Sequence, residues 1–190
     1  MKGILFNLLE RVVTETHGED AWEDVLDAAG STGAYTAVGN YTDKEFLALV
    51  SQAASLGGVT PDDLLRDFGR RSFPLLAEGY PHFFEGHDET LGFLLTLNDI
   101  IHVEVRKLYP GAETPFFEYD SDAPDALRMS YHSTRDMCAL AEGFVLGAAA
   151  HFDERIEVEQ TRCSKKGDDS CLFVLSFRKE RLAAGPGVAG

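Results

Sequence analysis

Residues 89–108 read ETLGFLLTLNDIIHVEVRKL, and this stretch has the strongest helical pattern of the chain. Its apolar side chains recur every three or four residues, which places them on one face of a helix. Pro110 and Gly111 then end the pattern. The residues of this face are Leu91, Leu94, Leu95, Asn98, Ile101, His102, Val105 and Leu108.

His102 is the one histidine on that face. A neutral imidazole in dry surroundings suits the iron of a haem, because the ring nitrogen can coordinate the metal from within an apolar pocket. An isolated histidine on an apolar face is more often a hydrogen-bonded core residue. His102 is therefore a candidate iron ligand that needs support from other residues.

Helical patterns also precede this stretch. The prediction rests on the apolar spacing, on a capping box at Thr42–Glu45 and on the helix start signal at Thr60–Pro61. The predicted helices cover residues 4–13, 42–50, 60–68 and 73–80.

The last third of the chain is different, because it is rich in short β-forming segments separated by turn residues. The predicted strands are 116–119, 126–131, 155–163 and 171–177. A helix over 133–152, with Ser133 as its N-cap, interrupts them. This order predicts an α+β fold: an N-terminal helical part followed by a four-stranded antiparallel sheet with one inserted helix. One domain is expected over residues 1–181, with a flexible tail over 182–190.

The composition argues against some classes of function. The 190 residues include 17 basic and 32 acidic side chains, for a net charge of −15. A nucleic-acid partner is not expected, because phosphate binding needs a clustered positive surface. Glu10 and Arg11 interrupt the first apolar stretch before it could form a signal peptide or a membrane span. We therefore expect a cytoplasmic protein without membrane contact.

The pattern Y-x-S-x-R stands at residues 131–135, where a predicted strand hands over to a helix. Tyr131, Ser133 and Arg135 could direct a phenol, a hydroxyl and a guanidinium toward one anionic group. The plainer interpretation is a serine N-cap beside a solvent-exposed arginine.

In combination these features resemble the haem nitric oxide/oxygen binding (H-NOX) family, of the stand-alone bacterial nitric oxide sensor type. The resemblance rests on Asp99-Ile-Ile-His102, on Pro115, on the Y-x-S-x-R pattern and on the opening Met1-Lys-Gly-Ile4. It extends from Met1 to about Phe177, nearly the whole chain.

The resemblance implies that haem b lies between the helical part and the sheet. His102 would be the proximal iron ligand, and Tyr131, Ser133 and Arg135 would hold the propionates. Pro115 would press on the porphyrin and distort it. Nitric oxide would weaken the bond opposite it, so that His102 leaves the iron and a partner reads the released helix. Typical partners in the family are a histidine kinase or a cyclic-di-GMP enzyme.

Members of the family that hold oxygen use a distal tyrosine as a hydrogen-bond donor. Aligned on Y-x-S-x-R, Leu140 occupies that position, while Leu9 and Ser72 stand where a supporting tryptophan and asparagine would be. A missing donor forfeits about 1.5–3 kcal/mol for bound oxygen. The resemblance therefore implies binding of nitric oxide and carbon monoxide and exclusion of oxygen. The apolar lining would be completed by Leu5, Leu76 and Phe144.

Three cysteines complete the candidate residues. Cys163 and Cys171 flank a predicted hairpin turn, and the helix after Y-x-S-x-R could bring Cys138 to them. Three thiolates make a zinc site plausible, and some oxygen-excluding members of the family have one. Their histidine ligand is replaced here by Gln160, so that the fourth ligand could be water, His151 or another group. A thiol redox switch and three inert buried cysteines are the other interpretations.

Three functions follow. The first is a haem-based gas sensor without enzymatic activity. The second is a haem-independent zinc or thiol redox sensor that uses the three cysteines. The third, a haem peroxidase, is disfavoured because an apolar distal side offers no acid or base to cleave an O–O bond.

Overall fold

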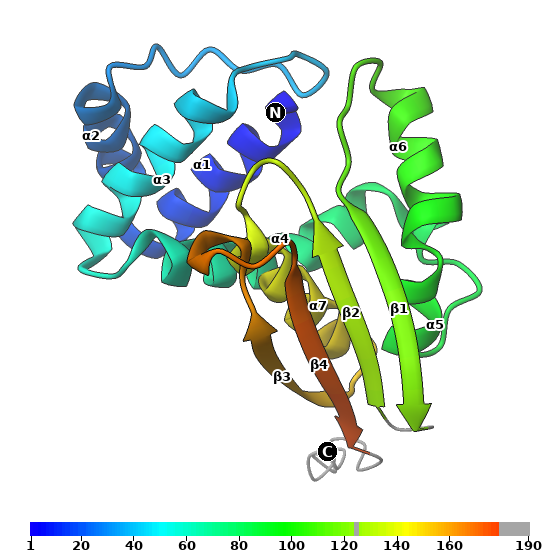
Figure 1. The fold of residues 1–190 in the computed structure, drawn as a ribbon. Coiled ribbons are helices and arrows are strands. Elements are labelled where there is room, and N and C mark those ends of the chain that lie inside the picture. The colour runs from blue at the N-terminus through cyan, green and yellow to red at the C-terminus, as the bar shows by residue number, and fades with distance from the viewer. Residues whose placement is uncertain (124–125, 179–190) are drawn as a thin grey trace, which may run out of the picture.

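Four helices form the N-terminal part of the fold. In Figure 1 the first three lie on one side of the molecule and the fourth runs from them across the middle. The computed structural model describes residues 1–123 and 126–178, so the predicted tail lies outside the described residues. The four helices share a core in which Phe6, Phe46 and Phe68 are completely buried. Their bounds are α1 Gly3–His17, α2 Glu19–Ala29, α3 Asp43–Gly57 and α4 Pro61–Gly79.

The predicted capping residues begin two of these helices. The Thr42 hydroxyl accepts a hydrogen bond from the Glu45 amide, and Thr60 accepts one from Asp63, both at 3.1 Å. The expected division into helices 60–68 and 73–80 was wrong. Both belong to α4, which contains Pro74. Burial of Phe68 and Phe73 on the two sides of the division keeps the helix continuous, although proline removes one backbone donor.

The sheet confirms the predicted fold class. Its order is β1-β2-β4-β3, and all three neighbouring pairs are antiparallel. Phe173 and Leu175 of β4 are completely buried, and the sheet packs against the inserted helix α7, Cys138–His151 (Figure 1). The strands are β1 Phe116–Ala123, β2 Ala126–His132, β3 Arg155–Arg162 and β4 Cys171–Arg178.

Helix α7 begins later than predicted, and Ser133 is not its N-cap. The helix starts at Cys138, after Met137. The Ser133 hydroxyl instead accepts a hydrogen bond from the Arg135 amide at 3.2 Å, which holds a local turn between β2 and α7. Of the Y-x-S-x-R pattern, Tyr131 therefore lies in β2, and Ser133 and Arg135 lie in the turn that follows it rather than in a helix.

Glycines allow α4 and α7 to approach each other closely. A Cβ atom at Gly143 would lie 2.2 Å from the Arg66 carbonyl oxygen, and one at Gly69 would lie 2.7 Å from the Leu140 carbonyl oxygen. Neither position can accept a side chain without moving backbone. This contact joins the helical part to the helix that supports the sheet.

The stretch 89–108 is not one regular helix. It contains α5 Thr90–Leu95, a π-helical turn η2 over Leu97–Ile101, and α6 His102–Leu108. The wider turn changes the helical phase, so that Leu95 and Leu108 are 47% and 48% exposed instead of sharing the buried face. A short 3-10 turn η1, Pro81–Phe83, lies between α4 and α5, and another, η3 Ser164–Lys166, between β3 and β4.

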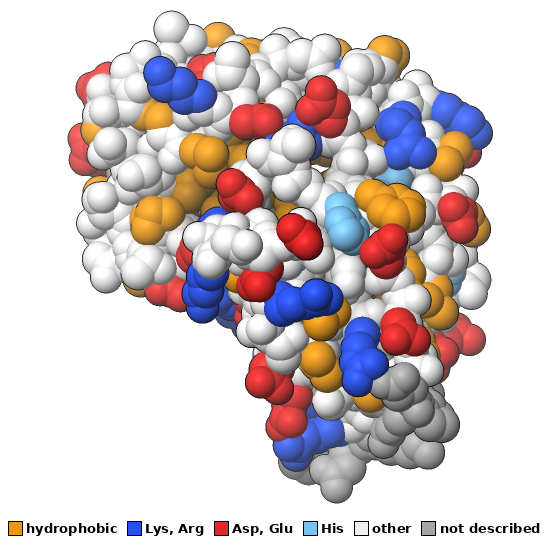
Figure 2. All heavy atoms as spheres, viewed as in Figure 1, with side chains coloured by type: hydrophobic (Ala, Val, Ile, Leu, Met, Phe, Trp, Pro, Cys, Tyr) orange, Lys and Arg blue, Asp and Glu red, His pale blue; other side chains and the backbone are white. Residues whose placement is uncertain are grey.

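The surface carries charges of both signs. Acidic and basic side chains are interspersed with hydrophobic ones over the face drawn in Figure 2. Within residues 1–123 and 126–178, no helix is long and apolar enough to cross a membrane.

Candidate functional site

A cavity of about 320 Å³ lies between the helical part and the sheet part. Its size falls in the range of about 300–1,000 Å³ that is usual for small-molecule and cofactor sites. Helices α1, α4, α5, α6 and α7 and strands β1 and β2 all contribute to its walls. Of the predicted site residues, the cavity brings together His102, Pro115, Tyr131, Ser133, Arg135, Leu5, Leu76, Leu140 and Phe144.

His102 faces this cavity from the first residue of α6. Burial and, to a smaller extent, the charge of Arg106 lower the pKa of His102 to about 4, although an interaction with the backbone of Pro115 partly opposes them. Its Nδ1 atom is buried and has no hydrogen-bond partner among the described residues. A neutral imidazole with an unsatisfied ring nitrogen in a mostly apolar cavity has the properties of a metal ligand.

Asn98 is a site residue whose role the sequence did not reveal. It lies in the π-helical turn before His102, and its amide pairs with both backbone groups of Phe117. The turn that positions His102 is thereby fixed to the first residues of β1. The helical pattern had placed Asn98 on the apolar face, but its partner could not be inferred from spacing alone.

Tyr131, Ser133 and Arg135 all border the cavity. The Arg135 guanidinium is the most strongly held, because Nε donates to Asp43 at 2.8 Å and Nη2 donates to Glu113 at 2.9 Å. Burial alone would raise the pKa of Asp43, but contacts with the Met1 amino group and Arg135 outweigh it and lower the pKa. Asp43 and Glu113 thus connect Arg135 to α3 and to the segment before Pro115.

The wall around Leu140 is apolar. Leu5, Leu76, Leu140 and Phe144 line the cavity from α1, α4 and α7. Leu9 and Ser72 do not border it within the part of the chain that the structure describes. Leu9 is completely buried in the helical core, and Ser72 is buried with a hydroxyl that has no partner among the described residues.

A tyrosine pair lies elsewhere on the cavity wall. The hydroxyls of Tyr80 and Tyr109 are hydrogen-bonded to each other, and both rings border the cavity. Burial raises the pKa of Tyr109, and Tyr80 adds to the rise. Sequence reasoning missed this pair, because the two residues are separated by 29 positions and follow different helices.

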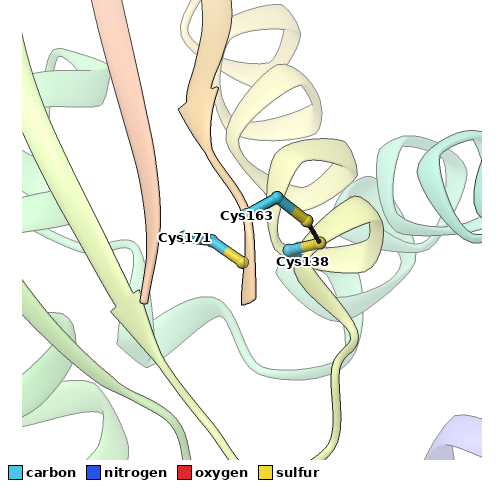
Figure 3. Close-up of side chains that lie close together, drawn as sticks. All are labelled: Cys138, Cys163 and Cys171. Carbon is cyan, nitrogen blue, oxygen red and sulfur yellow. Dashed lines mark hydrogen bonds between the residues drawn. The ribbon is translucent and has the colours of Figure 1, made fainter. Parts of the chain in front are cut away.

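The three cysteines meet at a second place, outside the cavity. Their sulfur atoms all lie within 4.8 Å of one another. Figure 3 shows Cys138 at the start of α7 and the other two at the adjoining ends of β3 and β4, with the side chains converging. The spacing around the predicted turn therefore led to a real cluster.

Comparison with known proteins identifies the family. The Haem-NO-binding family model matches residues 2–160. A crystal structure of an H-NOX protein from S. oneidensis in the Fe(II)NO ligation state is 28% identical, covers 94% of this chain and 99% of that chain, and has a TM-score of 0.89. The Fe(II) unliganded H-NOX protein from K. algicida is 26% identical, with coverages of 97% and 100% and a TM-score of 0.87.

A third similar structure was determined in another ligation state. It is the NMR structure of an H-NOX domain from Shewanella oneidensis in the Fe(II)CO state, which is 28% identical, covers 95% of this chain and 100% of that chain, and has a TM-score of 0.86. The chain belongs to the haem-NO-binding (H-NOX) family, a family of haem-binding gas sensors rather than enzymes.

Proposed function

We propose that the cavity holds haem b with His102 as the protein ligand to the iron, and that the protein senses nitric oxide in the presence of oxygen. The observation that carries the proposal is the buried, partnerless Nδ1 of His102 on the wall of a cavity between the two parts of the fold. Ferrous haem supplies an iron centre that binds diatomic gases. Tyr131, Ser133 and Arg135 supply the polar end of the cavity that propionates require.

The apolar side of the cavity supports the selectivity. Leu140 and its neighbours offer no hydrogen-bond donor. The hydrogen bond between the hydroxyls of Tyr80 and Tyr109 uses one of their two protons and leaves one donor on the cavity wall. Bound oxygen carries negative charge and gains about 1.5–3 kcal/mol from a donor, which corresponds to roughly tenfold to a hundredfold in affinity. Nitric oxide and carbon monoxide depend much less on such a donor, so that the cavity favours them.

His102 also gives the proposed signal a structural basis. It is the first residue of α6, directly after the π-helical turn. Departure of His102 from the iron would release α6 from the cavity wall and leave the anchor at Asn98 in place. A partner that contacts the released surface would read the change. We propose a histidine kinase or a cyclic-di-GMP enzyme as this partner, and the cytoplasm as the location.

The test is the visible absorption spectrum of the reduced, haem-loaded protein under argon, in air and with nitric oxide. We expect a five-coordinate ferrous spectrum that does not change in air and that becomes a five-coordinate nitrosyl spectrum with nitric oxide. A stable oxygen complex would refute the selectivity, and Tyr80→Phe would then show whether the tyrosine pair is the donor.

Two variants test the ligand. His102→Gly should lose haem during gel filtration and regain it when free imidazole is supplied. His132→Gly is the matched control, because His132 is half-buried, pairs with Glu118 and does not border the cavity. Equal haem retention in both variants would refute His102 as the ligand.

A second candidate function is favoured by the convergence of the three cysteines. A haem-independent response to a metal or to oxidation would use Cys138, Cys163 and Cys171. Such a response would persist in His102→Gly, whereas gas sensing through the haem would be lost.

A further inference from the structure

The three thiols form a closed and largely dry cluster. Cys138, Cys163 and Cys171 are 2%, 6% and 0% exposed. The sulfur atoms of Cys138 and Cys163 are 3.9 Å apart (Figure 3). A metal–thiolate bond of about 2.3 Å requires sulfur–sulfur separations of roughly 3.8–4.0 Å, so this pair is already spaced for a shared ion.

The cluster lacks a fourth ligand of the kind that zinc requires. Structural zinc is almost always bound by four ligands. Among the described residues, no histidine or carboxylate belongs to the group that the sulfur atoms form. His151 is excluded, since it ends the helix that Cys138 begins, and 13 residues of helix separate the two by about 20 Å. Its ring packs against Phe73 and Phe84 instead.

Gln160 acts on the cluster as a hydrogen-bond donor. The Gln160 side chain is hydrogen-bonded to Cys138. The Ser164 amide donates to the Cys171 sulfur at 3.3 Å, and the Ser164 hydroxyl lies at the same distance from it. Lys165 interacts electrostatically with Cys138 and Cys163. These groups stabilise negative sulfur atoms and leave the three sulfurs as the ligands.

Burial of the three side chains argues against a free thiol switch. Reactive cysteines lie in partly exposed surroundings where an oxidant can reach the sulfur atom. All three side chains are instead shielded from solvent. The cluster therefore fits ion binding better than it fits a redox switch, because a bound ion takes the place of the thiol protons.

We propose that Cys138, Cys163 and Cys171 form a three-coordinate site for a soft monovalent ion, Cu(I), in preference to Zn(II). Thiolate ligands suit both Cu(I) and zinc. Structural zinc is almost always four-coordinate, whereas Cu(I) accepts three sulfur ligands without a fourth. On binding, each protonated thiol releases its proton to solvent and no electron is transferred. This inference deepens the second candidate function and does not depend on haem binding.

The test is X-ray absorption at the copper and zinc edges on the full-length protein, loaded anaerobically with each ion alone against a chromophoric chelator. We expect Cu(I) with three sulfur neighbours and no nitrogen or oxygen neighbour, and Zn(II) that the chelator removes. Cys138→Ser should lose Cu(I) retention at least tenfold. The haem spectrum is recorded on the same samples, so that failure of haem binding and failure of ion binding are read separately.

Gln160→His supplies the decisive comparison, because it changes no thiol. An imidazole at this position adds the missing ligand and should raise the Zn(II) affinity about tenfold or more, with four-coordinate zinc. Glu159→His is the matched control, since successive side chains of a strand point to opposite faces. The proposal is overturned if the wild-type protein holds four-coordinate zinc, if Gln160→His and Glu159→His bind zinc equally, or if neither ion is retained.

Discussion

Asn98 holds Phe117 by both of its backbone groups: Nδ2 donates to the Phe117 carbonyl oxygen at 2.6 Å, and Oδ1 accepts from the Phe117 amide at 3.1 Å. This pair is the polar connection between the turn before His102 and the edge strand β1. A side chain four residues before His102 therefore fixes where α6 begins.

Replacing Asn98 tests this connection. Asn98→Ala leaves both backbone groups of Phe117 without their partner, and we expect a loss of about 2 kcal/mol in the free energy of unfolding. Urea denaturation measures the loss, and the visible spectrum measures how much His102 remains bound to iron in the ferrous protein. Ile100→Ala is the control, because Ile100 lies in the same turn and is 52% exposed. Equal effects of the two variants would contradict the role of Asn98.

The haem-free protein should lose stability in acid because of His102. Its pKa is about 4 in the folded protein, below its ordinary value of 6.5, since burial disfavours the charged ring. Between these values the unfolded chain binds a proton that the folded chain does not, so this contribution is complete above pH 6.5 and is lost as the pH falls toward 4. It amounts to at most about 3 kcal/mol.

The measurement is the free energy of unfolding by urea at several pH values for the wild-type protein and for His102→Leu. The difference between the two isolates His102 from the many carboxylates. We expect the wild-type protein to lose more stability than the variant between pH 6.5 and 4. Parallel curves would show that His102 titrates in the folded protein as it does in the unfolded chain.

Leu140→Tyr should convert the apolar wall into one that retains oxygen. The tyrosine hydroxyl would donate to the outer atom of the bound gas, which predicts a gain of roughly tenfold to a hundredfold in oxygen affinity. The oxygen dissociation rate after reduction reports the change. Leu140→Phe adds a ring of the same size without the hydroxyl, and a similar gain in that variant would rule out the hydrogen bond as the cause.

Gly143→Ala should destabilise the contact between α4 and α7. The new methyl group would lie 2.2 Å from the Arg66 carbonyl oxygen, so that backbone must move at a cost of about 1–3 kcal/mol. Thermal unfolding should show a midpoint lower by several degrees. Gly79→Ala is the control, because a Cβ there meets nothing within 4 Å. This variant should keep or raise the midpoint of thermal unfolding.

The sequence predicted those parts of the fold in which the periodicity is regular. The β-forming segments between turn residues located β2 and β4, and the threonine caps located α3 and α4. Helix α2 was missed although Ala21, Trp22 and Val25, its buried residues, recur at helical spacing. The π-helical turn was missed because apolar residues continue through it at nearly helical spacing.

The sequence was enough to predict which residues form the candidate site, but not how most of them contact one another. His102 and Tyr131 could be marked from their motifs, whose spacing is short. The partners of Arg135 could not, because Asp43 lies 92 positions away and only the tertiary fold brings it near. Ser133 was predicted as a helix N-cap because a serine directly before an apolar helical stripe is usually one. In the structure its hydroxyl instead stabilises a turn by accepting a hydrogen bond from the Arg135 amide.

At the π-helical turn, the number of residues matters more for the position of His102 than the identity of the side chains. Each residue of an α-helix advances the direction of the side chain by about 100°, so removal of one residue from Leu97–Ile101 would rotate His102 away from the cavity even if every other side chain were unchanged. Substitutions at its positions other than Asn98 alter only local packing. Over evolutionary time this segment should therefore keep Asn98 and its residue count while its other positions vary, which makes the distance from Asn98 to His102 a better marker of the site than any of the three residues between them.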